Sequence, residues 1–338
     1  MDDGGTLELK KEFTMNNTIN DLVSSKGSAP CLFYPVAKEM GISIHAVLTG
    51  SKIQKDVLVR IAEEYPVSAV IRMTELWCEA TSFGMNCSMD DADFPKLGTP
   101  LYTDIAALEA ALVPPPINDT TSPLIEAVKL AVPCMKKKPL IIGATGPYTL
   151  GSVLNGSAEF MVNCMMEPGI VHAFLEKITS FLTAYALEYK KAGANGIILA
   201  EPSVAMISPD MTEEFSNRYI ERFISEIQDD TFTVIYHNCG AVNSHMEAIA
   251  KLSAQAFHLG SDVDLKLALD VLPADRIIMG NIDPRRFLFE TPSQIEAETR
   301  AMLIRYGKFR NYISSTGCDL SPSARLDSIS RFCSTTAR

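Results

Sequence analysis

The feature that most limits the fold of this chain is a regular alternation between short apolar runs and longer amphipathic stretches. After residue 18, each run of apolar and β-branched residues is followed by a turn and then by a stretch with helical periodicity. Strands that alternate with helices pair in parallel, and eight of them can close into a barrel. The strands are predicted at residues 31–36, 69–73, 140–144, 196–200, 232–237, 256–259, 276–280 and 312–316.

This rhythm predicts an α/β protein built on a single (β/α)8 TIM barrel, with a doubly wound open sheet as the competing fold. Residues 1–18 lack apolar periodicity and are interpreted as an N-terminal extension, either a tail or an extra helix. Residues 19–338 are assigned to the barrel. Helices are predicted at residues 161–191, 212–228, 244–254 and 291–306.

Charge and composition exclude some classes of protein. The formal net charge is −11 and the Lys and Arg residues are scattered, which argues against a nucleic-acid partner. No run of about 18 apolar residues is present, so no membrane span is expected. The first residues are polar and do not form a secretory signal, and the eight cysteines are irregularly spaced. We therefore expect a cytoplasmic protein with reduced cysteines, and we leave a homodimer open.

The sharpest polar motif is His237-x-Cys239, at the end of the fifth predicted strand. Side chains two residues apart on a strand point to the same face, so both can bind one ion. Functional residues gather at the C-terminal ends of barrel strands, and Cys318 follows the eighth one. One imidazole and two thiolates suit zinc. We predict a zinc site of these three residues, the alternative being a buried histidine beside two packing cysteines.

Three scattered ligands favour a catalytic zinc, because structural zinc sites usually carry four protein ligands. With two thiolates the ion keeps little net charge, so it polarises carbonyls weakly but holds an incoming thiol as a thiolate. Transfer of an alkyl group to that thiol is the favoured reaction. Activation of water is the alternative, with Glu79 or Glu201 as the general base.

Other polar residues at predicted strand ends are candidates for the same pocket. Glu79 and Glu201 are the catalytic candidates, although a helix surface or a structural cap would also explain them. Gly146 and Thr149 are predicted to place backbone amides at the floor of the substrate pocket, unless they form only a tight turn. Asn281 and Asp283 are predicted to bind substrate and to orient His237 from behind, or to form a turn that ends the strand.

Four segments resemble a known family: GATGPYTL at 143–150, YHNCG at 236–240, GNIDP at 280–284 and SSTGCD at 314–319. They resemble the uroporphyrinogen decarboxylase superfamily, and within it the cobalamin-dependent methyltransferases typified by methylcobamide:coenzyme M methyltransferases. The resemblance covers residues 28–335. It implies a barrel whose zinc activates coenzyme M or a related thiol. It also implies a partner corrinoid protein that carries the methyl group as methylcobalamin, because this chain has no Asp-x-His-x-x-Gly corrinoid motif.

Two departures from the family pattern affect what is carried over. Gly260 stands where the methanogen enzymes have a glutamate that serves as a fourth zinc ligand, so water, a buffer molecule or His258 is predicted there. The first predicted strand lies in CLFYPVAKEMG and has no arginine, whereas the classical decarboxylases carry an arginine-rich motif in this region. Decarboxylation of a tetrapyrrole or another carboxylate therefore stays the second function. A non-catalytic corrinoid-handling barrel is the third, and the direction of methyl transfer is left open.

Overall fold

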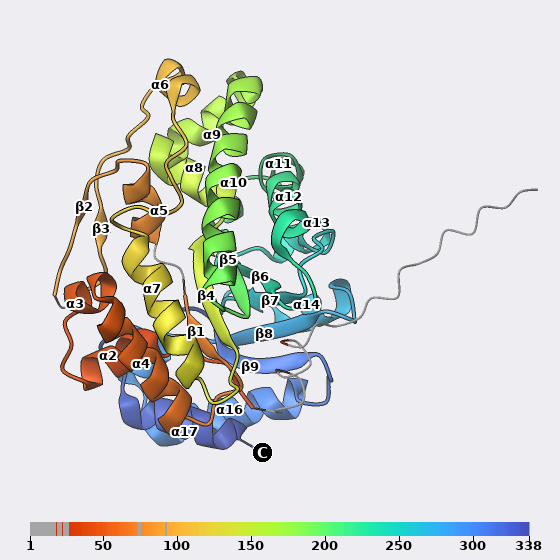
Figure 1. Cartoon of the computed structure of the whole chain (residues 1–338). Helices are drawn as coiled ribbons and strands as arrows, with labels where there is room; N and C mark the ends of the chain where they lie inside the picture. Colours follow the sequence, from red (N-terminus) through yellow and green to blue (C-terminus); the bar gives the residue numbers. More distant parts are fainter. Residues whose placement is uncertain (1–17, 19–21, 23–26, 74–75, 92, 338) are drawn as a thin grey trace, which may run out of the picture.

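The computed structural model describes the chain except residues 1–17, 19–21, 23–26, 74–75, 92 and 338. Within this part, seven parallel strands form one curled sheet in the order β1-β4-β5-β6-β7-β8-β9 (Figure 1). A small antiparallel pair, β2 (Cys87–Ser88) and β3 (Lys96–Leu97), lies between β1 and β4 in the sequence. The strands of the sheet are β1 Val70–Arg72, β4 Leu140–Thr145, β5 Gly196–Ala200, β6 Thr233–Asn238, β7 Ala256–Leu259, β8 Ile277–Ile282 and β9 Tyr312–Thr316.

Seven of the eight predicted strands are confirmed to within two residues at each end, and the first is wrong. Residues 33–39 form the helix α2 (Phe33–Glu39) instead of a strand. Pro35 explains the difference, because it lies in the first turn of the helix, where a missing N–H costs nothing. In a central strand the same proline would remove a hydrogen bond of the ladder.

The two edges of the sheet meet at Ser28. This residue makes single parallel bridges to Val67, which precedes β1, and to Ser314 in β9. The Ser68 N–H donates to the Ser28 carbonyl at 2.8 Å, and the Ala29 N–H donates to the Ser314 carbonyl at 3.0 Å. In the described chain these bridges link the segment just before β1 to β9, where the first predicted strand was expected to close the barrel. The fold is therefore an α/β sheet of seven strands, curled like a TIM barrel and joined at one residue.

Helices surround the sheet; α8, α9 and α10 pack against one another, and α10 also contacts β4 (Figure 1). The helices of the described chain are α2, α3 Ile44–Thr49, α4 Ser51–Glu64, α5 Leu76–Ser82, α6 Ile105–Ala110, α7 Ser122–Ala131, α8 Pro147–Asn155, α9 Ser157–Met166, α10 Pro168–Lys191, α11 Pro209–Thr212, α12 Arg218–Ile227, α13 Met246–Ile249, α14 Leu265–Val271, α15 Arg286–Phe289, α16 Pro292–Tyr306 and α17 Leu326–Thr336. Short 3-10 turns cover Val132–Cys134, Pro202–Met206 and Asn243–His245, and a π-helical turn covers Glu213–Asn217. None of the described helices is long and apolar enough to cross a membrane.

Three of the four predicted helices have different bounds, and one is confirmed closely. The predicted helix at 244–254 is only the 3-10 turn at Asn243–His245 followed by the short helix α13. The predicted helix at 161–191 is two helices, because Pro168 starts α10 and disfavours helical backbone at Glu167. The predicted helix at 212–228 is divided by the π-helical turn before α12. The prediction at 291–306 is confirmed as α16, which Thr291 and Gln294 start with a reciprocal capping box.

The sheet separates two apolar layers, and this separation positions the site. Alternate strand residues face a small cluster inside the curl, including Ile141, Ile198 and Ile235, while the others pack under the helices. His237 is the next residue of β6 after Ile235 that faces inward, because alternate strand residues share a face. The apolar interior thus gives way to polar side chains at the C-terminal ends of the strands.

The predicted boundary at residue 18 falls on a part of the chain that is mostly outside the described residues, so it stays a prediction. Thr18 itself is buried, and its hydroxyl donates to the Asn195 carbonyl at 3.3 Å. Leu22 is buried within the inner apolar cluster.

Candidate metal centre

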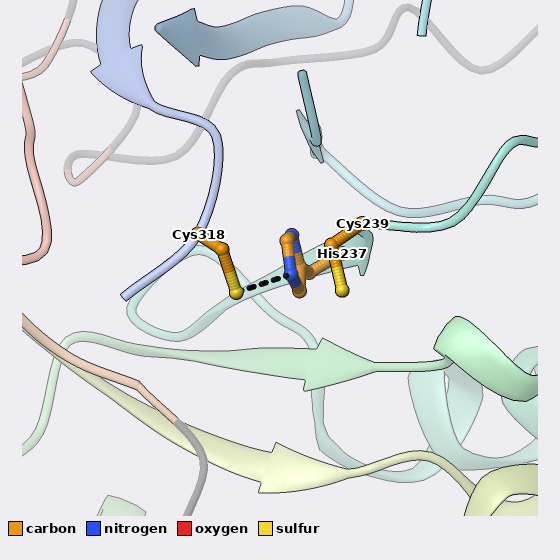
Figure 2. A group of neighbouring side chains, drawn as sticks. All are labelled: His237, Cys239 and Cys318. Atoms are coloured by element: carbon orange, nitrogen blue, oxygen red, sulfur yellow. Dashed lines mark hydrogen bonds between the residues drawn. The ribbon is translucent and has the colours of Figure 1, made fainter. Parts of the chain in front are cut away.

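The structure brings His237, Cys239 and Cys318 together at the C-terminal ends of β6 and β9 (Figure 2). One ligand atom from each residue lies within 4.8 Å of the other two. His237 is buried in β6, Cys239 follows the end of that strand, and Cys318 follows β9. Among the described residues this is the cluster of three or more metal-capable side chains that could hold an ion.

The spacing of the donor atoms fits a shared zinc ion. The Cys318 Sγ lies 3.7 Å from the His237 Nε2. A sulfur and a nitrogen that bind one zinc tetrahedrally, at about 2.3 and about 2.05 Å, are about 3.6 Å apart. The two cysteines are only partly exposed and form no disulfide. The donor set therefore matches zinc in both chemistry and distance.

The two thiols behave as one hydrogen-bonded pair. The Cys318 thiol donates to the Cys239 sulfur, and this bond lowers the pKa of Cys239, with burial opposing the shift and His237 adding to it. The same bond and burial raise the pKa of Cys318. Cys239 thus ionises more readily than Cys318, and a metal bound to both sulfurs would displace the second proton.

His258 lies behind His237 rather than beside the cysteines. The His237 Nδ1 faces both the His258 carbonyl, at 2.9 Å, and the His258 Nδ1, at 2.8 Å. The other ring nitrogen of His258, Nε2, lies 2.9 Å from the Ser315 hydroxyl. Burial and the nearby His237 lower the pKa of His258 well below its usual range, so its ring is neutral. Both nitrogens of His258 are engaged away from the cysteines, so the suggestion that it supplies the fourth ligand is wrong.

Gly260 and Gly317 allow the backbone to pass close to the cysteines. A Cβ at Gly260 would lie 2.5 Å from the Cys239 Cα and 3.0 Å from its carbonyl oxygen. A Cβ at Gly317 would lie 2.8 Å from the Ser261 N. These contacts are with backbone atoms, which cannot rotate away. A glutamate at position 260 does not fit this backbone, so the departure from the family pattern is built into the packing.

Asn281 supports the neighbouring loop instead of contacting His237. Its Nδ2 donates to the carbonyls of Gly260 and Val263, at 2.8 Å in each case. Asp283 accepts two hydrogen bonds from the Arg285 side chain. The predicted support of His237 by Asn281 and Asp283 is replaced by His258, and their substrate-binding role stays a prediction. Both residues line a cavity of about 450 Å³ between the ends of β7 and β8 and α16.

Glu201 is buried on the outer side of the sheet, at the start of α8. Its Oε1 accepts from the Thr149 N–H, so it caps the N-terminus of α8 from another strand. Gly146 leaves room for this carboxyl, because a Cβ there would lie 1.8 Å from the Glu201 Oε2. The Thr149 hydroxyl accepts from the Ser203 N–H at 3.1 Å. Burial raises the pKa of Glu201 to about 8.

These contacts give Glu201, Gly146 and Thr149 a structural role, because they join β5 to α8. A structural role was the alternative to a site role that the sequence left open for each of them. Glu79 is buried in α5, and its Oε1 accepts from the Thr145 N–H at 3.1 Å. None of these four residues belongs to the group of ligand atoms around His237. Their catalytic and substrate-binding roles stay predictions.

Sequence reasoning missed the support behind the histidine ligand. Ser315 is buried on β9, and its hydroxyl donates to the Ala29 carbonyl at 2.8 Å. The signal was present in the alternation of the strands, because His258 pairs with His237 in register and therefore shares its face. Ala29 gives no comparable signal, since a backbone carbonyl leaves no mark on the residue type.

The model of the family described as Uroporphyrinogen decarboxylase (URO-D) matches residues 37–338. A uroporphyrinogen decarboxylase from Pelodictyon phaeoclathratiforme is 27% identical over 265 residues, which are 75% of this chain and 74% of that protein. One from Paraburkholderia xenovorans is 25% identical over 282 residues, covering 79% of this chain and 76% of the relative.

Solved structures show the same fold. A methyltransferase from Methanosarcina mazei superposes with a TM-score of 0.81 at 20% identity, covering 96% of this chain and 98% of that one. A B12-independent methionine synthase from Shewanella sp. W3-18-1 gives a TM-score of 0.56 at 14% identity, over 93% of this chain and 95% of the other. The family match spans the strands, the cysteines and the histidine described above. This chain belongs to the uroporphyrinogen decarboxylase family.

Proposed function

We propose that this protein is a zinc-dependent methyltransferase that moves a methyl group between a corrinoid protein and a zinc-activated thiol. The observation that carries the proposal is the group of one imidazole and two thiols within 4.8 Å at the C-terminal ends of β6 and β9. The fold likeness to the Methanosarcina mazei methyltransferase is compatible with it. Coenzyme M or a related small thiol is the acceptor that the resemblance suggests.

Within the described chain the site supplies three protein ligands, and neither His258 nor position 260 supplies a fourth. His258 is engaged behind His237, and a side chain at position 260 is excluded by the Cys239 backbone. Catalytic zinc sites keep a fourth position open, whereas structural sites close it. Zinc held by two thiolates and an imidazole lowers the pKa of a bound thiol until it reacts as a thiolate.

The protein's own groups prepare the site for that chemistry. The His237 Nδ1 is committed to hydrogen bonds behind the ring, which leaves Nε2 directed toward the Cys318 sulfur (Figure 2). The thiol pair offers one sulfur with a lowered pKa. His237, Cys239 and Cys318 would hold the zinc and, with it, the acceptor thiolate. The corrinoid of the partner protein would supply the methyl group and would keep the electron pair of its carbon–cobalt bond when the thiolate takes the methyl carbon.

A decarboxylase is the second candidate, and the names of the curated relatives favour it. A tetrapyrrole with several carboxylates needs cations near its binding site. Residues 31–41, the segment CLFYPVAKEMG, contain one lysine and no arginine. Arg72 is buried at the end of β1, with its guanidinium 5.7 Å from the ring centre of Phe33. These features favour methyl transfer over decarboxylation.

Metal analysis and a transfer assay test the proposal. Purified protein should contain about one zinc per chain and should demethylate methylcobalamin with coenzyme M or homocysteine. Cys239→Ser and Cys318→Ser should lose both zinc and activity, while Cys134→Ser, a change at a partly exposed cysteine outside the cluster, should keep both.

Three outcomes would contradict the proposal. A folded protein without zinc excludes the metal site. A zinc protein that releases carbon dioxide from uroporphyrinogen but transfers no methyl group is a decarboxylase. A zinc protein inactive in both assays, with every thiol tested, is a binding or scaffolding barrel.

A further inference from the structure

We propose that His258 and Ser315 are positioning residues that fix the tautomer of His237. They do so through a series of hydrogen bonds that ends at the Ala29 carbonyl. The inference concerns the metal ligand itself and so rests on the proposed zinc site. His258 and Ser315 are fully buried, and neither contacts the cysteines through a polar atom in the contacts described.

The direction of the first two hydrogen bonds follows from Ala29. A backbone carbonyl can only accept, so the Ser315 hydroxyl spends its single proton on the Ala29 oxygen, 2.8 Å away. The same hydroxyl must then accept from the His258 Nε2, 2.9 Å away, which places a proton on that nitrogen.

The His258 carbonyl determines the state of His237. The two Nδ1 atoms are 2.8 Å apart, and one proton must lie between them. The His258 carbonyl can only accept and lies 2.9 Å from the same His237 Nδ1, so this proton belongs to His237 and the facing His258 Nδ1 accepts it. A metal can then bind His237 only through Nε2, the ring nitrogen that lies 3.7 Å from the Cys318 sulfur.

Fixing the tautomer matters because a metal binds only the unprotonated nitrogen of a neutral imidazole. In metal sites, a hydrogen bond to the far nitrogen usually comes from a carboxylate, a carbonyl or water. Here a second histidine and its own carbonyl take that place, in a region without solvent. Removing such support typically costs about 10- to 100-fold in metal affinity.

The test reads the tautomer directly in the metal-free, full-length protein. The chain has five histidines, so long-range proton–nitrogen NMR spectra of protein labelled at histidine nitrogen can be assigned by substitution. Wild-type protein should show the Nδ1–H form for His237 and the Nε2–H form for His258. Ser315→Ala should give a mixture of tautomers at both rings. Zinc affinity, measured by competition with a chromophoric chelator, should fall about 10- to 100-fold in the same variant.

Two further substitutions separate positioning from packing. His258→Asn keeps an acceptor oxygen near the place of Nδ1 and should retain more zinc affinity than His258→Leu. His245→Leu is the matched control, because His245 is also buried and is bonded to a serine hydroxyl and to the Ile207 carbonyl. It should lower stability without changing the affinity for zinc.

The outcomes distinguish this inference from the proposed function. Wild-type protein that binds no zinc rejects the proposed site, while the spectra of the metal-free protein still decide the tautomer. Wild-type protein that binds zinc, with unchanged affinity in Ser315→Ala and His258→Leu, overturns the positioning role. An Nε2–H form of His237 in the metal-free wild type overturns it as well.

Discussion

Substitution of Gly260 by alanine tests the geometry of the metal centre most sharply. The new Cβ would lie 2.5 Å from the Cys239 Cα, whereas ordinary contact begins at 3.4 Å. Relief of the overlap requires a displacement of about 0.9 Å, shared between two backbone segments. Metal–ligand distances tolerate about 0.2 Å. We therefore expect Gly260→Ala to weaken zinc binding by at least about tenfold and to lower the free energy of unfolding by about 1–3 kcal/mol.

Chelator competition measures the affinity, and urea unfolding of the metal-free protein measures the stability. Gly169→Ala is the control, because a Cβ at Gly169 meets nothing within 4 Å and the residue lies in the first turn of α10. It should leave zinc binding unchanged and stability equal or slightly higher. If Gly260→Ala binds zinc as tightly as the wild type and unfolds at the same urea concentration, the close approach of the two segments is not as described.

Three more changes have expected outcomes. Asn281→Ala leaves the carbonyls of Gly260 and Val263 without their donor, so we expect a loss of about 1–3 kcal/mol in urea unfolding and weaker zinc binding. The pKa of Glu201 is about 4.5 in the unfolded chain and about 8 in the folded protein. Because the folded protein holds this proton more tightly, the free energy of unfolding falls as the pH rises between these values, by at most about 4–5 kcal/mol. Glu201→Gln should remove that pH dependence, and parallel slopes for both proteins in urea unfolding across this range would contradict it. Zinc at about 1,000 times its dissociation constant should raise the free energy of unfolding by about 4 kcal/mol, measured with and without chelator, and should have no such effect on Cys318→Ser.

Most of the fold could be predicted from the sequence, because buried parallel strands leave an unmistakable apolar pattern. The exception was the segment after Cys31, where apolar residues suited either a strand or a buried helix. Pro35 was the signal that could have decided between them. The bridges at Ser28 left no such signal, because a single pair of residues makes no run.

The candidate site, like the fold, could be predicted only in part. The clustering of His237, Cys239 and Cys318 could be predicted, because histidine and cysteine at strand ends are rare and their geometry follows from the alternation of the strands. The surroundings could not, because they depend on contacts between distant backbones. Asn281 was expected behind His237 but holds the adjacent loop, and Glu201 was weighed as a base but caps α8.

The closure of the sheet has a consequence for how the protein is made. Ala29 and Ser315 are 286 residues apart in sequence, so their hydrogen bond joins nearly the first described segment to one of the last. Chains are synthesised from the N-terminus, and long-range contacts form late. A ribosome must therefore synthesise the chain through Cys318 before His237 and the two cysteines can come together. A nascent chain that stops before Ser315 would lack both Cys318 and the hydrogen bond to the Ala29 carbonyl.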